Sequence, residues 1–195
     1  MDIKQFFASV DHEILYGLIT ERIKDEDILW LIKQVVNSFV SDNGVSPRKG
    51  IPLGNLTSQI FANVYLNELD RFIKHNLKIK YYLRYADDFI ILDQDQTYLY
   101  RCIDTLKQFL ADRLKLELHS AKILIRKFSW GIDFCGYIVL PHYIIPRTKT
   151  RRRIYKKVLK DKVSPQSFQS YLGYFSHADS YQVQNDFTNI YYLTA

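Results

Sequence analysis

The stretch LRYADDFIIL at residues 83–92 constrains the fold more than any other part of the chain. Two short runs rich in Leu, Tyr, Phe and Ile flank the adjacent carboxylates Asp87 and Asp88, and aspartate is a common turn residue. The pattern predicts a strand, a tight turn and a second strand. Adjacent carboxylates repel each other and resist burial as anions, so the pair itself needs an explanation.

Two explanations are open on the dipeptide alone. Asp87 and Asp88 form either a polar hairpin turn or part of a divalent-cation site, because Mg²⁺ prefers oxygen ligands such as carboxylates. A two-metal site for phosphoryl displacement usually takes a third carboxylate from elsewhere. Asp2 is the candidate, since it lies in an apolar stretch where a lone charge is otherwise unfavourable. Its alternative interpretation is an ordinary charged terminus.

The rest of the chain predicts helices interspersed with short strands. Helices are expected after Asp11, over about 27–39, from about Thr57 and around Leu99–Leu110, and an aromatic helical tail from about Ser164. Strands are expected in DIKQFFASV, ILIRKF and IDFCGYIVL, the last forming a hairpin with YIIP across Pro141-His142. This order predicts an α+β fold, an antiparallel sheet with helices on one face.

Composition and charge narrow the class of protein. The chain has 195 residues, of which 47% are hydrophobic, so a sizeable core is expected and disorder is not. Its formal charge of +6 favours a polyanionic partner. Cys102 and Cys135 form no CxxC motif, and no long apolar span is present, so we expect a cytoplasmic protein without a membrane partner.

Basic residues are densest between Arg147 and Lys162, where nine of them stand against the single acid Asp161. This change of character places a boundary between residues 1–146 and 147–195. The basic segment is interpreted as a surface for a polyanion, and a solvated helix face is the alternative.

Four sequence blocks follow one another in the order found in reverse transcriptases. They are DIKQFF from Asp2, the loop IPLGNLTSQ, YADD at 85–88 and GIDFCGY at 131–137. The chain resembles the palm and a partial helical thumb of that polymerase fold. The resemblance implies an RNA-directed DNA polymerase, with an RNA template, a DNA primer and dNTPs as partners. It also implies that Asp2, Asp87 and Asp88 hold two Mg²⁺ ions, with Mn²⁺ as an alternative.

The resemblance extends to residues around the nucleotide. Phe7 resembles the bulky gate against a ribose 2′-hydroxyl, and Tyr85 the residue beside the primer end. A core Phe and a strand aromatic are the alternatives. Lys122 lies where the family often has a lysine near the triphosphate, although a solvated charge is the simpler interpretation. Leu53 and Gly54 belong to the loop expected to contact the incoming nucleotide.

The loop also points to a subtype. Most reverse transcriptases have the pattern QGxxxSP there, whereas this chain has LGNLTSQ, with Leu53 in place of Gln and Gln59 in place of Pro. This form resembles the error-prone enzymes of diversity-generating retroelements, which misincorporate chiefly at template adenines and work with a small basic accessory protein. A retron or group II intron type is the alternative. A catalytically inactive remnant that binds RNA/DNA hybrids is an alternative of another class.

The resemblance assigns the basic segment to the thumb. Arg151, Arg152, Arg153 and Lys156 are expected to contact template–primer phosphates. One residue precedes Asp2, so we expect the fingers region to be absent. An N-terminally truncated chain of this kind is expected to have little or no activity alone.

Overall fold

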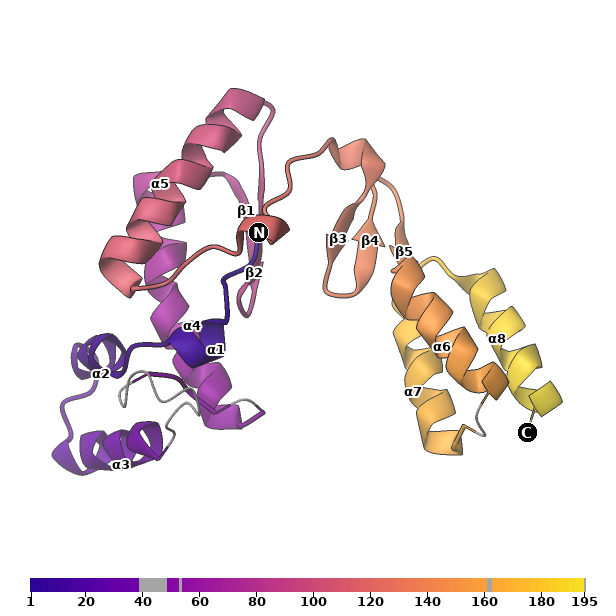
Figure 1. The fold of residues 1–195 in the computed structure, drawn as a ribbon, viewed down its shortest axis with the longest axis horizontal. Coiled ribbons are helices and arrows are strands. Elements are labelled where there is room, and N and C mark those ends of the chain that lie inside the picture. Colours follow the sequence, from indigo (N-terminus) through magenta and orange to yellow (C-terminus); the bar gives the residue numbers. More distant parts are fainter. Residues whose placement is uncertain (39–48, 53, 161–162, 195) are drawn as a thin grey trace. The chain divides into compact units, whose positions relative to one another are not determined.

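The computed structural model describes residues 1–38, 49–52, 54–160 and 163–194. The chain divides between Ile125 and Arg126 into two compact units, and each is described by itself. Figure 1 labels their elements. The first unit holds α1 (Phe6–Ser9), α2 (His12–Thr20), α3 (Glu26–Asn37), α4 (Leu56–Arg71) with a π-helical turn (Phe72–Asn76), β1 (Tyr81–Tyr85), β2 (Asp88–Leu92), α5 (Gln96–Leu114) and a 3₁₀ turn (Ser120–Lys122).

The predicted hairpin is confirmed. Strands β1 and β2 pair antiparallel from Tyr81 opposite Leu92 to Tyr85 opposite Asp88. One face of the hairpin buries Phe89 and Ile91 in the main core, whereas Tyr81 and Tyr85 on the other face are exposed. Helices α4 and α5 pack on the buried side. The α+β class, with helices on one face of the sheet, is thus found as predicted.

The start of the chain only partly follows its prediction. DIKQFFASV was expected to be one strand, but only Asp2 and Ile3 form strand bridges, to Asp88 and Leu118. Gln5 then takes a left-handed backbone, with φ of 46°, and Phe6–Ser9 turns into the short helix α1. The strand prediction was wrong here because burying Phe6 in the core turns the chain away from the sheet.

The predicted helices all form, and their boundaries have local causes. Asp11 begins α2, because its Oδ1 accepts hydrogen bonds from the backbone amides of Glu13 and Ile14 at 3.0 and 3.2 Å. In α5 the buried residues include Leu106 and Leu110, as their helical spacing predicts. The helix ends at Lys115, which adopts a left-handed C-cap.

The second unit combines a small sheet with three helices. Its elements are a 3₁₀ turn (Phe128–Trp130), β3 (Ile132–Phe134), β4 (Tyr137–Val139), β5 (Ile144–Pro146), α6 (Thr148–Lys160), α7 (Pro165–Ser176) and α8 (Tyr181–Thr194). The strands form one antiparallel sheet in the order β3-β4-β5. Its helical core gathers apolar side chains from all three helices, including Val158, Phe168 and Phe187.

Two strand predictions differ from the structure in this region. ILIRKF (123–128) forms no strand, and IDFCGYIVL is itself a hairpin because Cys135 and Gly136 both have positive φ, of 48° and 88°. The predicted turn across Pro141-His142 is found between β4 and β5.

The sheet belongs with the helices that follow it. The rings of Tyr137 and Tyr174 stack with centroids 4.9 Å apart, and the Tyr174 hydroxyl donates to the carbonyl of Gly136 at 2.6 Å. These contacts explain why the compact units divide near Ile125 and not at residue 147. The assignment of 1–146 as palm and 147–195 as thumb stays a prediction. Among the described helices, none has both the length and the apolar character to cross a bilayer.

Candidate active site

Backbone pairing places Asp2 directly opposite Asp88. The two residues form an antiparallel bridge at the end of β2 where the hairpin turns. On the other side of Asp2, the amide of His119 donates to the Asp2 carbonyl at 2.9 Å. Asp2 is therefore held between two segments and is buried, with 8% of its surface exposed. Residues that face each other across a bridge point to the same side of a sheet, so the two carboxyl groups share one site.

Lys122 completes this cluster. Its Nζ lies 2.6 Å from Oδ2 of Asp2, and the 3₁₀ turn Ser120–Lys122 that follows His119 carries it there. The hydrogen bond that Lys122 donates to Asp2 raises the pKa of Lys122, so this side chain is an ammonium at neutral pH. Lys122 is thus paired with Asp2 and also solvated, with 54% of its side chain exposed, and its role near a triphosphate stays a prediction.

The pKa values of both hairpin carboxylates, Asp87 and Asp88, are raised. Partial burial, then a hydrogen bond to Asp2 and the charges of Asp2 and Asp87, raise the pKa of Asp88, and Lys122 opposes this only weakly. Burial and the charge of Asp2 also raise the pKa of Asp87. Both shifts have the sign expected for anions crowded together.

The turn between β1 and β2 determines the positions of Asp87 and Asp88. Ala86 has φ of 52°, a left-handed conformation that is uncommon for a residue with a Cβ. Tyr85, the last residue of β1, is 68% exposed and flanks the turn. The tight turn predicted for ADD is confirmed, and it sets Asp87 and Asp88 one after the other at the edge of the first unit.

The carboxylates of this site are chemically suited to a divalent cation. Carboxylate oxygens are hard ligands that suit Mg²⁺, and a cation would relieve the repulsion that raises the pKa of Asp88. Within the described ranges, however, no three His, Cys, Asp or Glu side chains converge closely enough to hold a metal ion. The chemistry therefore fits Mg²⁺, while the geometry brings Asp2 and Asp88 together as a pair and leaves Asp87 acting through its charge.

The other predicted nucleotide residues are less closely defined. Phe7 is partly buried against the main core, with its ring 5.3 Å from that of Phe6, so its role as a gate stays a prediction. Gly54 has φ of 92° and open space around the position of a Cβ. Leu53 lies outside the described residues. Arg151, Arg152, Arg153 and Lys156 are exposed on α6 in the second unit.

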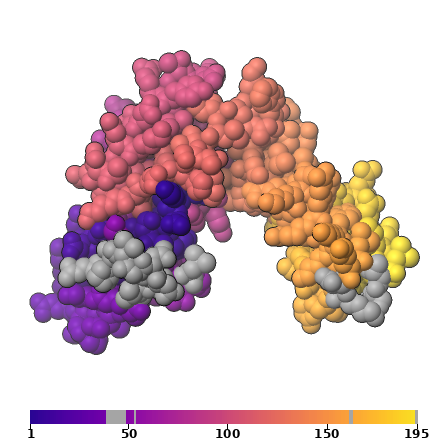
Figure 2. Space-filling view, viewed as in Figure 1, coloured from indigo at the N-terminus to yellow at the C-terminus, as the bar shows by residue number. Residues whose placement is uncertain are grey.

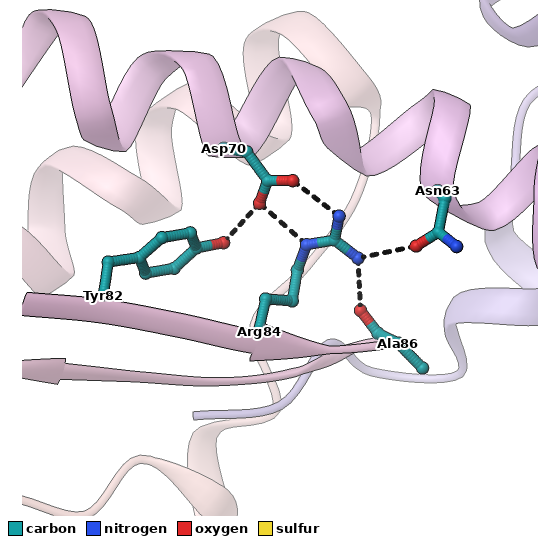
Figure 3. Close-up of polar contacts among 5 residues, drawn as sticks. All are labelled: Asn63, Asp70, Tyr82, Arg84 and Ala86. Atoms are coloured by element: carbon teal, nitrogen blue, oxygen red, sulfur yellow. Dashed lines mark hydrogen bonds and ion pairs between the residues drawn. The ribbon is translucent and has the colours of Figure 1, made fainter.

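Sequence reasoning missed a polar network directly behind the turn. Arg84 of β1 forms an ion pair with Asp70 of α4 and donates to the carbonyl of Ala86, as Figure 3 shows. Asn63 and Tyr82 complete the network. Alternation along β1 was the available signal. Tyr81, Leu83 and Tyr85 share one face, so Arg84 had to point inward and needed a buried partner.

Comparison with known proteins decides the family. The profile of the family described as reverse transcriptase (RNA-dependent DNA polymerase) matches residues 1–139, well over half of the chain. The chain belongs to this family. The match contains both the bridge of Asp2 to Asp88 and the segment that carries Lys122, so the site described above lies within the conserved reverse transcriptase domain.

Several individual proteins are similar to the chain. The group II intron-encoded protein LtrA of Lactococcus lactis subsp. cremoris is 28% identical over 200 residues, covering 70% of this chain and 33% of that protein. The uncharacterized 91 kDa protein in the cob intron of Schizosaccharomyces pombe is 38% identical over 82 residues, 41% of this chain and 10% of that protein. Protein YkfC of Escherichia coli K12 is 24% identical over 170 residues, 70% of this chain and 45% of that protein. The chain thus spans about a third of the length of LtrA.

Asp88→Asn should raise the free energy of unfolding near neutral pH, by less than about 1 kcal/mol because solvent screens a partly exposed carboxylate. The pKa of Asp88 is raised in the folded state, so folding favours its protonated form. The stability that the wild-type chain gains from protonated Asp88 is fully present below the ordinary aspartate pKa of about 4. This stability is lost as the pH rises through the raised pKa of the folded state. Urea unfolding at a series of pH values measures the growing gap.

Asp112→Asn, an exposed position on α5, is the matched control and should show no such growth. A gap between Asp88→Asn and wild type that stays constant from about pH 4 to about pH 7 would contradict the assigned repulsion.

Proposed function

We propose that this chain is the catalytic part of an RNA-directed DNA polymerase, which adds deoxynucleotides to the 3′-hydroxyl of a DNA primer on an RNA template. One observation carries the proposal. In a chain of the reverse transcriptase family, the backbone pairs Asp2 opposite Asp88, beside Asp87 and within reach of the Lys122 ammonium. This arrangement gathers negative charge where a cation and a triphosphate can be held.

Asp2, Asp87 and Asp88 would hold two Mg²⁺ ions, with Mn²⁺ as the alternative. When bound, such ions lower the pKa of the primer hydroxyl and neutralise charge on the triphosphate and the leaving pyrophosphate. Lys122 would protonate or pair with the leaving pyrophosphate, and its contact with Asp2 supports this role. The exposed ring of Tyr85 would lie against the primer end, and Phe7 would limit the space for a 2′-hydroxyl.

Asp2→Asn and Asp88→Asn should each lower the rate of Mg²⁺-dependent primer extension on an RNA template by roughly a thousandfold, which is about 4 kcal/mol of transition-state stabilisation. Each substitution removes a charge that holds the metal while keeping the shape of the side chain. Gel-resolved single-nucleotide extension measures the rate, and Asp112→Asn should extend like wild type.

The same assay separates the catalytic proposal from a non-catalytic one. A wild-type chain that binds an RNA/DNA hybrid but extends its primer no faster than Asp88→Asn would overturn the polymerase and favour a binding remnant.

Helix α6 supports a nucleic-acid-binding role for the second unit. The helix carries seven basic residues and no acidic one between Thr148 and Lys160. Ile154 and Val158 anchor it to the helical core, so Arg152 and Lys156 project from the opposite side. This helix lies at the surface of the unit, in orange in Figure 2. We propose that Arg151, Arg152, Arg153 and Lys156 contact phosphates of template and primer, which gives affinity without sequence choice.

The double variant Arg152→Glu/Lys156→Glu should weaken binding of an RNA/DNA hybrid and reduce the slope of log K against log salt by about 1 to 2, because each lost phosphate contact removes about 0.7 to 0.9. Fluorescence anisotropy at a series of salt concentrations measures both quantities. Arg22→Glu, an exposed cation just after α2, is the control. Unchanged affinity with an unchanged salt slope would show that α6 is only a solvated face.

For the subtype we propose an error-prone enzyme of the diversity-generating retroelement kind. The support is the loop LGNLTSQ, in which Leu53 stands where most of the family has Gln. A Leu side chain offers no hydrogen bond to the incoming nucleotide, so discrimination by polar contacts weakens. A small basic accessory protein, part of the same prediction, would be a partner of such an enzyme.

Leu53→Gln in an active enzyme should reduce misincorporation at template adenines by about two- to tenfold, the effect of one added hydrogen bond of about 0.5 to 1.5 kcal/mol. Sequencing of cDNA copies gives the error spectrum. Leu53→Met, which changes shape little and adds no hydrogen-bond donor, should leave the spectrum as it is. An unchanged spectrum in the Gln variant would contradict the subtype argument.

A group II intron type is the second candidate, and one observation favours it. LtrA is by name a group II intron-encoded protein, and the 91 kDa fission-yeast protein is named for its place in the cob intron. The error spectrum of the wild-type chain distinguishes the two subtypes. Errors spread evenly over template bases would favour the intron type.

A further inference from the structure

An ion pair lies beneath the hairpin, on the side opposite the exposed face of Tyr81 and Tyr85. Arg84 Nε donates to Oδ1 of Asp70 at 2.7 Å, and Nη2 donates to Oδ2 at 2.6 Å, so the contact is bidentate. Only 10% of the Arg84 side chain is exposed. The Tyr82 hydroxyl adds a third hydrogen bond to Asp70, at 2.6 Å (Figure 3).

The pKa values of Arg84 and Tyr82 are both raised by their surroundings. Burial acts to lower the pKa of Arg84, but the hydrogen bonds and charge of Asp70 outweigh it and raise that pKa. Burial, then the hydrogen bond and charge of Asp70, raise the pKa of Tyr82, so its hydroxyl stays a donor. Arg84 and Tyr82 both act as donors to Asp70 in this network.

The remaining nitrogen of Arg84 reaches the turn. Nη1 donates to the carbonyl of Ala86 at 2.8 Å and to Oδ1 of Asn63 at 3.3 Å. Ala86 is the residue held in the left-handed conformation, immediately before Asp87. A left-handed alanine is strained and persists only where its surroundings hold it. Arg84 supplies such a restraint, and α4 anchors it through Asp70 and Asn63.

Fold stability alone gives a poor reason for this arrangement. A buried ion pair gains little over well-packed apolar side chains, because both charges lose their hydration. Its distinctive property is geometry. A planar guanidinium that makes two hydrogen bonds to one carboxylate has a fixed orientation, so it can hold another acceptor in a fixed direction. The third group here is the carbonyl that begins the turn carrying both hairpin aspartates.

We propose that Arg84 is a positioning residue that fixes the Ala86 turn against α4 and so aims Asp87 and Asp88 toward Asp2. The inference rests on the proposed function for its catalytic consequence. The geometry of the turn itself is independent of catalysis, so the two can be tested apart. Asp70 is part of the same device, because it orients the guanidinium.

The test compares Arg84→Lys and Asp70→Asn with wild type. Lysine keeps the positive charge but lacks the planar guanidinium with its several donors. The Arg84→Lys variant can therefore fold, but its side chain cannot hydrogen-bond to Asp70 and Ala86 together. Arg71→Gln is the matched control, because Arg71 also lies on α4 and pairs with Glu68 at 3.2 Å, but on the exposed surface. Thermal unfolding followed by circular dichroism identifies temperatures at which every variant is folded.

Three measurements follow at such a temperature. NMR-detected hydrogen exchange reports the amides of residues 86–88 against those of α4 and α5. Electron paramagnetic resonance of Mn²⁺ gives the affinity of the site, with Asp88→Asn as the variant that should lose it. Primer extension separates kcat from KM for primer and template.

We expect Arg84→Lys to speed exchange at residues 86–88 while α4 and α5 keep wild-type rates. Mn²⁺ affinity should fall about tenfold to a hundredfold, the usual effect of removing a group that orients metal ligands. The kcat value should fall with it, and KM for primer and template should not change. Arg71→Gln should match wild type in all three measurements.

Two results would overturn the proposal. One is a folded Arg84→Lys variant with wild-type exchange at the turn. The other is exchange that rises equally throughout residues 1–125 with Mn²⁺ affinity unchanged, which is the signature of a purely stabilising pair. If the wild-type chain binds no Mn²⁺, the proposed metal site fails, and local exchange at residues 86–88 still decides the positioning role.

Discussion

The first unit depends on the backbone pairing of residues 1–4, which lie between β2 and the segment after α5. On one side, the amide of Phe89 donates to the Met1 carbonyl at 2.9 Å. On the other side, the amide of His119 donates to the Asp2 carbonyl at 2.9 Å, and the amide of Lys4 donates to the Glu117 carbonyl at 2.8 Å. These bonds satisfy backbone groups that would otherwise be buried unpaired, and they sink Ile3 into the core. Because the pairing is a strand register, the position of Asp2 opposite Asp88 follows from it without any side-chain preference.

Helix α4 ties this paired region to the helices around it. Tyr65, fully buried, donates its hydroxyl hydrogen to the carbonyl of Leu114 at 2.7 Å and accepts from the amide of Asp11 at 3.3 Å. Asp11 in turn caps α2 and pairs with Lys115 at 2.8 Å. The hydrogen bond and charge of Lys115 and the amides of α2 outweigh burial and lower the pKa of Asp11. A single phenol thus joins the start of α2 to the end of α5, and the same helix carries Asp70 toward the hairpin.

The sequence predicted those parts of the fold in which local pattern and tertiary contacts agree. The LRYADDFIIL hairpin and the amphipathic α5 follow directly from alternation and helical spacing. Prediction failed at Gln5, where distant packing decides the backbone conformation. It also failed at Cys135-Gly136, because this turn lacks the Asn-Gly pair that is typical of such hairpins. Within the site, the ordered motifs pointed to the three aspartates. Alternation along β1 indicated that Arg84 points inward, but it could not identify Asp70 as the partner, which lies fourteen residues away on α4.

The acidic residues of the first unit differ in how closely a cation is paired with them. Asp70 belongs to one set, and Asp2 and Asp88 belong to the other. Asp70 has a close cationic partner, since Arg84 donates two hydrogen bonds to it and only 10% of the Arg84 side chain is exposed. Asp2 receives a single contact from Lys122, whose side chain is 54% exposed and can swing into solvent. The pKa of Asp88 is raised although Lys122 lies nearby, because burial, the hydrogen bond to Asp2 and the neighbouring charges outweigh the effect of the lysine. The closely paired Asp70 therefore supports the turn, whereas Asp2 and Asp88 lie where the proposed metal site needs carboxylates without such a tight partner. The Arg84 network and the proposed site thus have different electrostatic requirements, and the turn at Ala86 connects them.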